Sequence, residues 1–251
     1  MKTIALLLFA LSAILRPVSG ADEPAFFELR TYHAHEGKLD ELHARFRDHT
    51  LALFEKHGMT NVAYWVPPEN EDQVLIYLLG YLDREAREEA WQTFRDDPEW
   101  KEVFRKSTAE GKLVEKVDSV FLTLTDYSPP LPGPTPGEPR LFEMRRYTAN
   151  PGKLDDLDAR FRDHTIKLFE KHDIANLPYF HLAENEKKSD ATLLYFLAHE
   201  SKDARDAAFK AFSEDPVWTA ARQASEENGK LLVEGGVEST LLEPTDYSPL
   251  K

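Results

Sequence analysis

The chain has 251 residues, of which 41% are apolar and 30% charged, a balance typical of globular proteins and not of fibrous or fully disordered ones. Its net charge of −14, with no basic run, argues against nucleic acid or an anionic membrane surface as a partner, because either needs Lys and Arg gathered on one face. The lack of cysteine excludes disulfides, thiolate metal sites and cysteine nucleophiles in this chain.

The first twenty residues have the layout of a secretory signal peptide. Lys2 precedes an apolar run from Ile4 to Leu15, and the small residues Ser19 and Gly20 follow. The apolar run is too short to span a bilayer comfortably. We therefore expect residues 1–20 to be a cleaved leader and the mature protein to be secreted or periplasmic, with no membrane attachment after cleavage. A retained membrane anchor is the alternative.

After the leader, the hydrophobic pattern predicts alternating strands and helices. In chain order it predicts a strand at 26–33, a helix at 37–57, strands at 60–66 and 74–81, a helix in two pieces at 83–95 and 98–104, and a strand at 117–124. The first helix carries an apolar stripe at Leu39, Leu42, Phe46, His49 and Leu53. The order β-α-β-β-α-β is that of a ferredoxin-like unit, in which one antiparallel sheet carries both helices on one face.

This unit occurs twice in the chain. Residues 26–129 recur at 141–249, shifted by 115 to 120 positions, and the segment 38–57 matches 153–172 at 16 of 20 positions. We therefore expect one domain at 26–128 and a second at 141–249. The linker between them, 129–140, contains six prolines and should be semi-rigid.

The strands predict how the two units pack. Segments 74–79 and 193–197 are apolar at both odd and even positions, so both faces of each sheet must be buried. The helices cover one face, and the sheet of the other repeat is the obvious cover for the second. The expected fold is therefore α+β, with two tandem ferredoxin-like repeats packed as an intramolecular dimeric α/β barrel. Pairing between whole chains, as a homo-oligomer, is the competing arrangement.

Several motifs resemble those of the NIPSNAP family. They are Phe27-Glu28-Leu29-Arg30-Thr31-Tyr32, Gly37-Lys38-Leu39 and Asp97-Pro98-Glu99-Trp100, and each recurs in the second repeat, at 142–147, 152–154 and 215–218. The resemblance implies a dimeric α/β barrel of the kind shared with small haem-degrading enzymes and cofactor-free monooxygenases, but it implies no agreed reaction. The leader and the duplication depart from the animal members of the family, so we expect an exported bacterial member.

The first candidate site is an alternating triplet on the first strand of each repeat. Glu28, Arg30 and Tyr32 share one face of their strand, as do Glu143, Arg145 and Tyr147 of the second repeat. One interpretation is a structural ion pair at the contact between the two sheets. The other is that Arg30 and Arg145 present their guanidinium groups to an anionic or carbonyl ligand, with the tyrosines as hydroxyl donors.

The second candidate is the histidine on the apolar stripe of the first helix, His49 or His164, which should point inward. Such a histidine is either a hydrogen-bonded core residue or a functional one. The resemblance implies a cavity between sheet and helices, in which some relatives hold haem through a helical histidine. In that interpretation His49 or His164 would be an axial ligand or a general base, with Tyr64 and Tyr179 lining the wall.

Other features point away from a known reaction class. The chain has no phosphate-binding glycine loop, no HExxH and no serine-hydrolase elbow. Neither a metal site nor a required cofactor is expected, haem being the one cofactor that the resemblance leaves open. The aromatic residues Trp91, Phe94, Trp100 and Phe104 are expected to be core. Two hypotheses remain: an exported module that binds a small molecule or a protein, and a cofactor-free monooxygenase or haem-handling enzyme.

Overall fold

The computed structural model describes residues 23–135 and 137–251, so the predicted leader lies outside the described residues. Repeat one contains β1 (Phe26–Ala34), α1 (Leu39–Arg45), the π-helical segment η1 (Phe46–Thr50), α2 (Leu51–Lys56), β2 (Thr60–Val66), β3 (Val74–Tyr81), α3 (Arg84–Asp96), α4 (Pro98–Ser107) and β4 (Val114–Leu124). Repeat two contains β5 (Leu141–Ala149), α5 (Leu154–Arg160), η2 (Phe161–Thr165), α6 (Ile166–Lys171), β6 (Ala175–Leu182), β7 (Thr192–His199), α7 (Lys202–Glu214), α8 (Pro216–Ser225) and β8 (Leu232–Pro244). Within the described ranges, no helix is long and apolar enough to cross a membrane.

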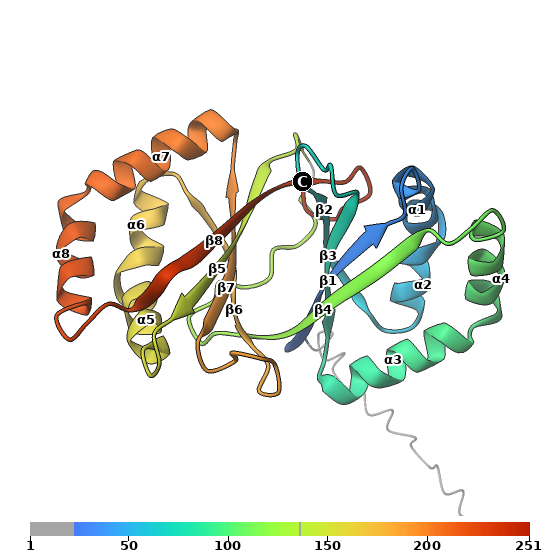
Figure 1. Ribbon diagram of the computed structural model, residues 1–251, viewed down its shortest axis with the longest axis horizontal. Coiled ribbons are helices and arrows are strands. Elements are labelled where there is room, and N and C mark those ends of the chain that lie inside the picture. Colours follow the sequence, from blue (N-terminus) through green and yellow to red (C-terminus); the bar gives the residue numbers. More distant parts are fainter. Residues whose placement is uncertain (1–22, 136) are drawn as a thin grey trace, which may run out of the picture.

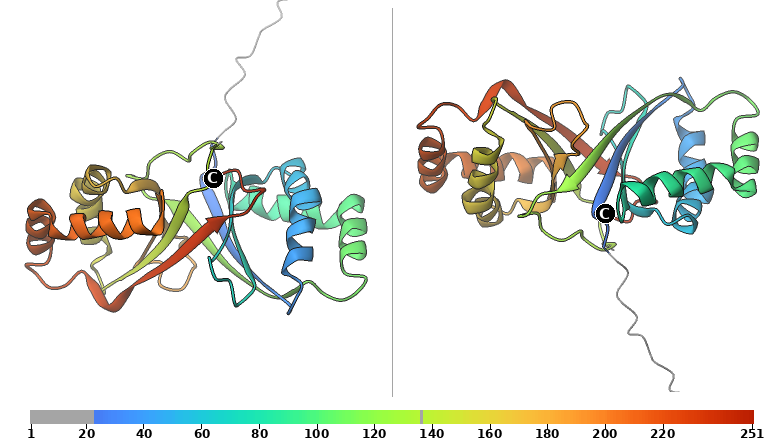
Figure 2. Two further views of the ribbon diagram at one scale, coloured as in Figure 1. Left: turned by 90° about the horizontal axis from the view of Figure 1, so that it is seen from above. Right: turned by 90° about the horizontal axis from the view of Figure 1, so that it is seen from below.

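The eight strands close into one barrel in the order β1-β3-β2-β8-β5-β7-β6-β4. Each repeat contributes a four-stranded antiparallel sheet, and the sheets join where β2 pairs with β8 and where β4 pairs with β6. The helices of the two repeats lie at opposite ends of the molecule, with the strands between them (Figures 1 and 2). This arrangement confirms the predicted intramolecular barrel.

The interior of the barrel is a filled apolar core built by both repeats. The inward-facing side chains of the strands meet there, with Phe27 against Phe180 at 5.2 Å between ring centroids and Trp65 stacked on Phe196 at 5.1 Å. A second apolar layer lies between each sheet and its own helices. The strands are buried on both faces because each sheet lies between these two layers.

The chain that follows the last strand of each repeat crosses to the other repeat. After β8, the Thr245 backbone N–H donates to the Tyr64 carbonyl at 2.9 Å, and the Tyr64 N–H donates to Ser248 Oγ at 3.0 Å. After β4, Thr125 and Ser128 make the same two bonds with Tyr179, at 2.9 and 3.0 Å. We call these segments, 125–128 and 245–248, the crossover tails. They extend the contact between the sheets beyond the short ladders of the barrel seams.

The first helix of each repeat differs from the uninterrupted α-helix that the periodicity predicts. Its middle turn is π-helical, and the Leu51 backbone N–H bonds to the Phe46 carbonyl five residues earlier. A π turn holds more residues than an α turn, so the side chains that follow are rotated relative to a regular helix. Thr50 and Phe54 are buried as a result, while His49 turns outward.

Candidate functional site

The glutamate of the triplet is the centre of a buried ionic network in repeat one. Glu28 is fully buried, and its carboxylate pairs with Arg30 on the same strand. Arg87 of α3 donates two hydrogen bonds to it, both of 2.9 Å, and Trp91 Nε1 donates another at 3.1 Å. Burial would raise the pKa of Glu28, but the hydrogen bond from Arg87 and the nearby charge of Arg30 outweigh it and lower that pKa. The network therefore attaches α3 to the sheet through a charged carboxylate.

Repeat two builds the same network with two replacements. Glu143 is fully buried and accepts bonds from Arg205 at 2.8 Å and from Ser239 at 2.6 Å, and it also pairs with Arg145. His199 stands at the end of β7 where Tyr81 ends β3, and Phe209 replaces Trp91. Glu28 has three neutral donors, Tyr81, Trp91 and Ser119, and Glu143 keeps only the counterpart of the last, Ser239.

The triplets lie on the opposite face of the sheet from the one expected. Tyr32 packs edge-on against Phe46 of η1, and the Arg30 guanidinium lies 4.5 Å from the Trp91 ring centre. Both contacts are with helices, whereas Phe27 and Leu29 face the other sheet. The interpretation of a structural ion pair between the two sheets is therefore wrong in its location. The alternation of the strand is correct, but alternation alone does not tell which of two buried faces the triplet occupies.

Arg30 and Arg145 have their hydrogen bonds met within the protein. Arg30 Nε donates to the Tyr77 hydroxyl at 2.9 Å, and its two terminal nitrogens reach Glu28 and the Tyr32 hydroxyl. Arg145 makes the corresponding contacts with Tyr195, Glu143 and Tyr147. Each nitrogen of these two guanidinium groups contacts an oxygen of the protein, so neither group is free to bind a ligand with two parallel hydrogen bonds.

The two helical histidines do not point inward. His49 and His164 are exposed because the π turn rotates them out of the apolar stripe. His49 lies beside Glu102 and Lys106 in a surface groove between α1 and α4. The expectation of an inward histidine is wrong, and the residues that take its place are Thr50 and Thr165.

Tyr64 and Tyr179, expected to line the wall of the cavity, are fully buried. Each stacks on a tyrosine of the next strand, Tyr64 on Tyr77 at 5.3 Å and Tyr179 on Tyr195 at 4.9 Å. Each also donates its hydroxyl proton to an asparagine, Asn61 or Asn176. They pack beneath the helices and line neither of the two cavities described next, so the expectation that they line the cavity wall is wrong.

A cavity of about 600 Å³ lies between the sheet and the helices of repeat one. Its wall is largely aromatic, and the lining includes Tyr32, Phe46, Phe54, Trp91, Phe94, Trp100 and Phe104. Trp91 and Phe94 are buried as expected of core residues, but Phe104 is 48% exposed at the rim. The expectation that all four aromatic residues of this segment are core is therefore wrong for Phe104.

Arg45 is the buried charge of this cavity. Its side chain lies over the ring of Trp100, with 5.4 Å between the guanidinium carbon and the ring centroid. One terminal nitrogen approaches Ser107 Oγ at 3.4 Å, while Nε is buried with no hydrogen-bond partner among the described residues. No ion pair in the described part of the chain includes Arg45, and burial lowers its pKa. A buried guanidinium in this state is poised to receive an anion.

The corresponding cavity of repeat two, also about 600 Å³, contains its own carboxylate. Arg160, the counterpart of Arg45, pairs with Glu226 at 3.2 Å through a terminal nitrogen. Its Nε, like that of Arg45, has no hydrogen-bond partner among the described residues, so the ion pair is what distinguishes the two arginines. Glu226 follows α8 at the position that Thr108 occupies after α4, and Arg222 stands where repeat one has Phe104. The two cavities have corresponding linings. In the described part of the chain, only the arginine of repeat two has a carboxylate of the protein as its partner.

The residues that line these two cavities do not fit the haem ligation that the family resemblance implies. Neither lining includes a histidine, and His49 and His164 lie outside both. In the described part of the chain, no group of three or more His, Cys, Asp or Glu side chains could hold a metal ion.

Sequence reasoning missed Arg45 and Arg160 as site residues. Arg45 lies three residues after Leu42, so it falls on the buried side of the first helix, and the string from Arg45 to Thr50 is identical in both repeats. The sequence did contain one sign of this site: both repeats have an arginine at the same position on the apolar stripe of the first helix. The absence of a partner in repeat one could not be read from the sequence, because Thr108 and Glu226 are distant from these arginines along the chain.

Comparison with known structures supports the fold of the whole chain. A candidate monooxygenase from Fusobacterium nucleatum aligns with a TM-score of 0.55 at 9% identity, over 88% of this chain and 92% of its own. A candidate monooxygenase from Lactobacillus acidophilus NCFM aligns with a TM-score of 0.53 at 8% identity, over 90% of this chain and 98% of its own. At such identities the likeness extends to the fold alone.

Both repeats match the same protein family. A NIPSNAP-like domain protein from Burkholderia xenovorans is 24% identical and covers 43% of this chain and 90% of its own, with a TM-score of 0.38. No curated protein matches the chain. The NIPSNAP family model matches residues 27–129 and again 142–249. The chain therefore belongs to the NIPSNAP family, with two copies of its domain.

Proposed function

We propose that this protein binds a small molecule in the cavity of repeat one, and that the ligand has an apolar body and a single carboxylate. The observation that carries the proposal is Arg45, a buried guanidinium without an anionic partner among the described residues, in a cavity walled by aromatic rings. Burying such a charge is costly unless an anion pairs with it.

The wall of the cavity favours the apolar body. Its volume of about 600 Å³ lies in the range of sites for organic ligands, and aromatic residues with few polar groups are typical of such sites. Phe104 and Val117, 48% and 40% exposed, lie at the rim. Exposed apolar residues grouped around an opening are a feature of binding sites.

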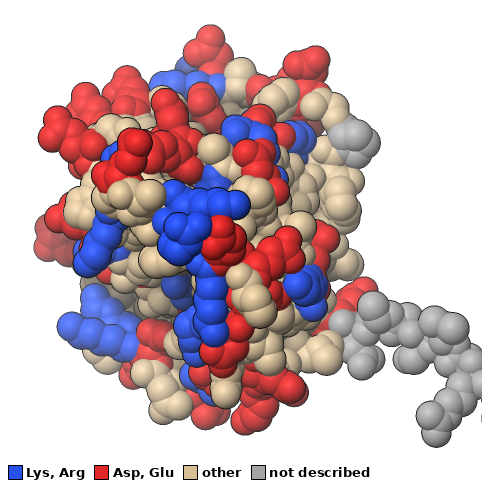
Figure 3. Space-filling view, turned by 90° about the vertical axis from the view of Figure 1, so that its right-hand side faces the viewer, with Lys and Arg blue, Asp and Glu red and all other residues tan. Residues whose placement is uncertain are grey.

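The charge around the cavity favours the carboxylate. Arg45, Arg95 and Lys101 line it with only one acidic residue, Glu115, although the whole chain carries −14. On the face of the molecule that carries α4, basic side chains form a band between acidic ones (Figure 3). Among the described residues Lys101 pairs with Asp96 at 3.3 Å, while Arg45 and Arg95 form no ion pair, so an anion that enters the cavity meets positive charge.

Repeat two indicates which kind of group pairs with the buried arginine. In that repeat a carboxylate, Glu226, lies 3.2 Å from Arg160 in the same kind of cavity. Thr108 leaves the corresponding place open to a carboxylate from outside the chain. The proposal includes no oxygenation step, because the candidate monooxygenases share only the fold with this chain.

The test is calorimetric titration of the chain with naphthoate, and with the uncharged naphthylmethanol as the matched ligand. We expect one naphthoate per chain and much weaker binding of the alcohol. Arg45→Met should weaken naphthoate binding by roughly tenfold to a hundredfold, the loss of one hydrogen bond to a charged group. Arg160→Met is the matched control and should leave the affinity unchanged.

Exchange of the carboxylate between the repeats makes the test sharper. Thr108→Glu places the counterpart of Glu226 beside Arg45 and should abolish naphthoate binding without loss of folding. Glu226→Ala should open the second cavity and raise the stoichiometry towards two. Equal binding of acid and alcohol, or unchanged binding by the Arg45→Met and Thr108→Glu variants, would contradict the proposal.

We also propose that the chain is exported and that residues 1–20 are removed. The support is the charged, apolar and small-residue order of this segment in the sequence. Amino-terminal sequencing of the protein recovered from a bacterial periplasm should begin near Ala21. A chain that keeps Met1 and sediments with membranes would refute this proposal.

A further inference from the structure

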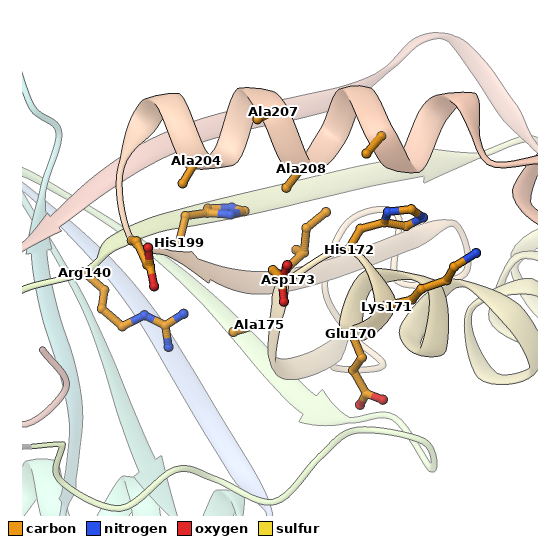
Figure 4. Close-up of a pocket in the computed structure, with 13 residues that line it drawn as sticks. Arg140, Glu170, Lys171, His172, Asp173, Ala175, His199, Ala204, Ala207 and Ala208 are labelled. Carbon is orange, nitrogen blue, oxygen red and sulfur yellow. The ribbon is translucent and has the colours of Figure 1, made fainter.

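A second cavity in repeat two, on the other side of α7 from the one that contains Arg160, holds a buried histidine. The cavity has a volume of about 710 Å³ and lies between α7, the end of α6 and the start of β6. His199, at the end of β7, is 1% exposed and lines it. Figure 4 shows the ring of His199 beside Ala204 and Ala208, with Arg140 at one end of the cavity and His172 at the other.

Small side chains line the cavity, and two of them stand where repeat one has larger ones. Four alanines of α7 form one wall: Ala204, Ala207, Ala208 and Ala211. In α3 the positions of Ala207 and Ala211 are occupied by Glu89 and Thr93. Thr93 contacts His57 at 3.1 Å, a contact that Ala211 cannot make with His172. Repeat two therefore lacks the counterpart of the contact between Thr93 and His57, and a cavity lies beside these positions.

Both ring nitrogens of His199 lack a hydrogen-bond partner in the described part of the chain. Nε2 lies 3.3 Å from a carboxylate oxygen of Glu143, close enough for an electrostatic contact but without hydrogen-bond geometry. In repeat one the same place is taken by Tyr81, whose hydroxyl reaches Glu28 at 3.3 Å and accepts a bond from Trp91. A buried nitrogen left unpaired is unfavourable, so Nδ1 calls for a polar atom from outside the chain.

The position of Nε2 indicates which ring nitrogen faces the cavity. Nε2 faces the Glu143 carboxylate, which also pairs with Arg145 and Arg205. With Nε2 facing the carboxylate, the hydrogen belongs on Nε2 and the lone pair on Nδ1. His199 would then accept a hydrogen bond from a ligand.

Arg140 supplies the complementary donor. One terminal nitrogen of its guanidinium donates to the Ala198 carbonyl at 3.1 Å, which holds the group beside the strand that carries His199. The other N–H groups remain available at that end of the cavity. An acceptor and a donor together match a hydroxyl, which gives one hydrogen and takes another, while the alanine wall offers a flat apolar surface.

We propose that this cavity binds a small phenol, whose hydroxyl donates to His199 Nδ1 and accepts from Arg140. The site is separate from the carboxylate site of repeat one and does not depend on it. It gives a role to three differences between the repeats: His199 in place of Tyr81, and Ala207 and Ala211 in place of Glu89 and Thr93.

The experiment is calorimetric titration of the Arg45→Met chain with para-cresol and with its methyl ether, which cannot donate a hydrogen bond. The Arg45→Met background removes the anion-binding group of the other cavity. We expect one cresol per chain, and binding of the ether weaker by roughly tenfold. His199→Tyr restores the residue of repeat one and should weaken cresol binding by at least as much.

A second variant keeps the test independent of His199. Ala207→Glu introduces the side chain of repeat one on the surface of α7, leaves His199 in place and should block the cavity. Thermal unfolding of both variants verifies that they fold. The proposal is overturned if cresol and its ether bind equally, if neither binds, or if folded His199→Tyr protein binds cresol as the parent does.

Discussion

Glu28 and Glu143 are single carboxylates that each bind two arginines in a buried setting. Glu28 pairs with Arg30 and Arg87, whose side chains are only 12% and 14% exposed. Glu28→Gln keeps the shape of the side chain but leaves Arg30 without an anion and Arg87 with only the exposed Glu88, at 3.0 Å. We expect the free energy of unfolding to fall by about 3–5 kcal/mol, the range for breaking a buried ion pair. Urea unfolding at neutral pH measures this loss, and a loss under about 1 kcal/mol would show that water replaces the carboxylate.

The same carboxylates predict an acid-sensitive stability. The pKa values of Glu28 and Glu143 are both lowered from their ordinary 4.5, in spite of burial, mainly by the hydrogen bonds from Arg87 and Arg205. A lowered pKa in the folded state gives stability that is present above 4.5 and is lost as the pH falls through the folded-state value. Unfolding free energies measured from neutral pH downward should therefore fall below about pH 4.5. The double variant Glu28→Gln with Glu143→Gln should show a flatter decline, and an equally steep one would assign the effect to other groups.

At this scale the sequence predicted the triplets but not their surroundings. Strand alternation places Glu28, Arg30 and Tyr32 on one face, because the side-chain period of a strand is two. Which of two buried faces they occupy depends on packing against distant helices. The partners Arg87 and Ser119, 59 and 91 residues away in the chain, could not be assigned from a local pattern.

Among the elements, the π-helical segments η1 and η2 determine which side chains reach the interior. Thr50 is buried, and its hydroxyl donates to the Arg45 carbonyl at 3.0 Å, as Thr165 does to Arg160 at 3.1 Å. Thr50→Val keeps the shape and removes the donor, so we expect a loss of about 1 kcal/mol in the free energy of unfolding. His49→Ala is the matched control at an exposed site and should change it by less than about 0.5 kcal/mol. A larger loss for His49→Ala than for Thr50→Val would mean that the helix is regular and that the histidine points inward.

The elements show where sequence periodicity is reliable and where it fails. The strands fall close to their predicted positions, because alternating or continuous apolar runs bounded by turn residues define them. The split of the second helix also follows from local chemistry: Asp97 caps α4 by accepting the Glu99 N–H at 2.7 Å, and Pro98 begins it. A π turn carries no such signal. The spacing of Leu42, Phe46, His49 and Leu53 fits a regular α-helix, so the pattern predicted the wrong inward residue.

For the whole molecule, the sheets of the two repeats close one barrel together. The strands with two apolar faces predicted this packing, because each sheet needs a second cover. The repeated Asp-Tyr-Ser-Pro sequence was visible too, but its role was not, since each crossover tail contacts the other repeat. Asp246 binds Arg47 with bonds of 2.6 and 2.7 Å, and Tyr127 donates to Asp158 at 2.6 Å. The crossover tail of each repeat thus bonds to the second strand of the other repeat, β2 or β6.

This reciprocity predicts that the repeats unfold together. Ser128→Ala and Ser248→Ala each leave the buried N–H of Tyr179 or Tyr64 without its acceptor, at a cost of about 1–3 kcal/mol. The unfolding transition should nevertheless stay single, because the filled barrel interior belongs to both repeats. Trp218→Phe leaves fluorescence only in repeat one, at Trp65, Trp91 and Trp100, while circular dichroism reports both repeats. We expect equal midpoints from the two signals in both serine variants. A fluorescence transition separated from the dichroism would mean that repeat one is stable without its partner, and that the crossover tails join two independent domains.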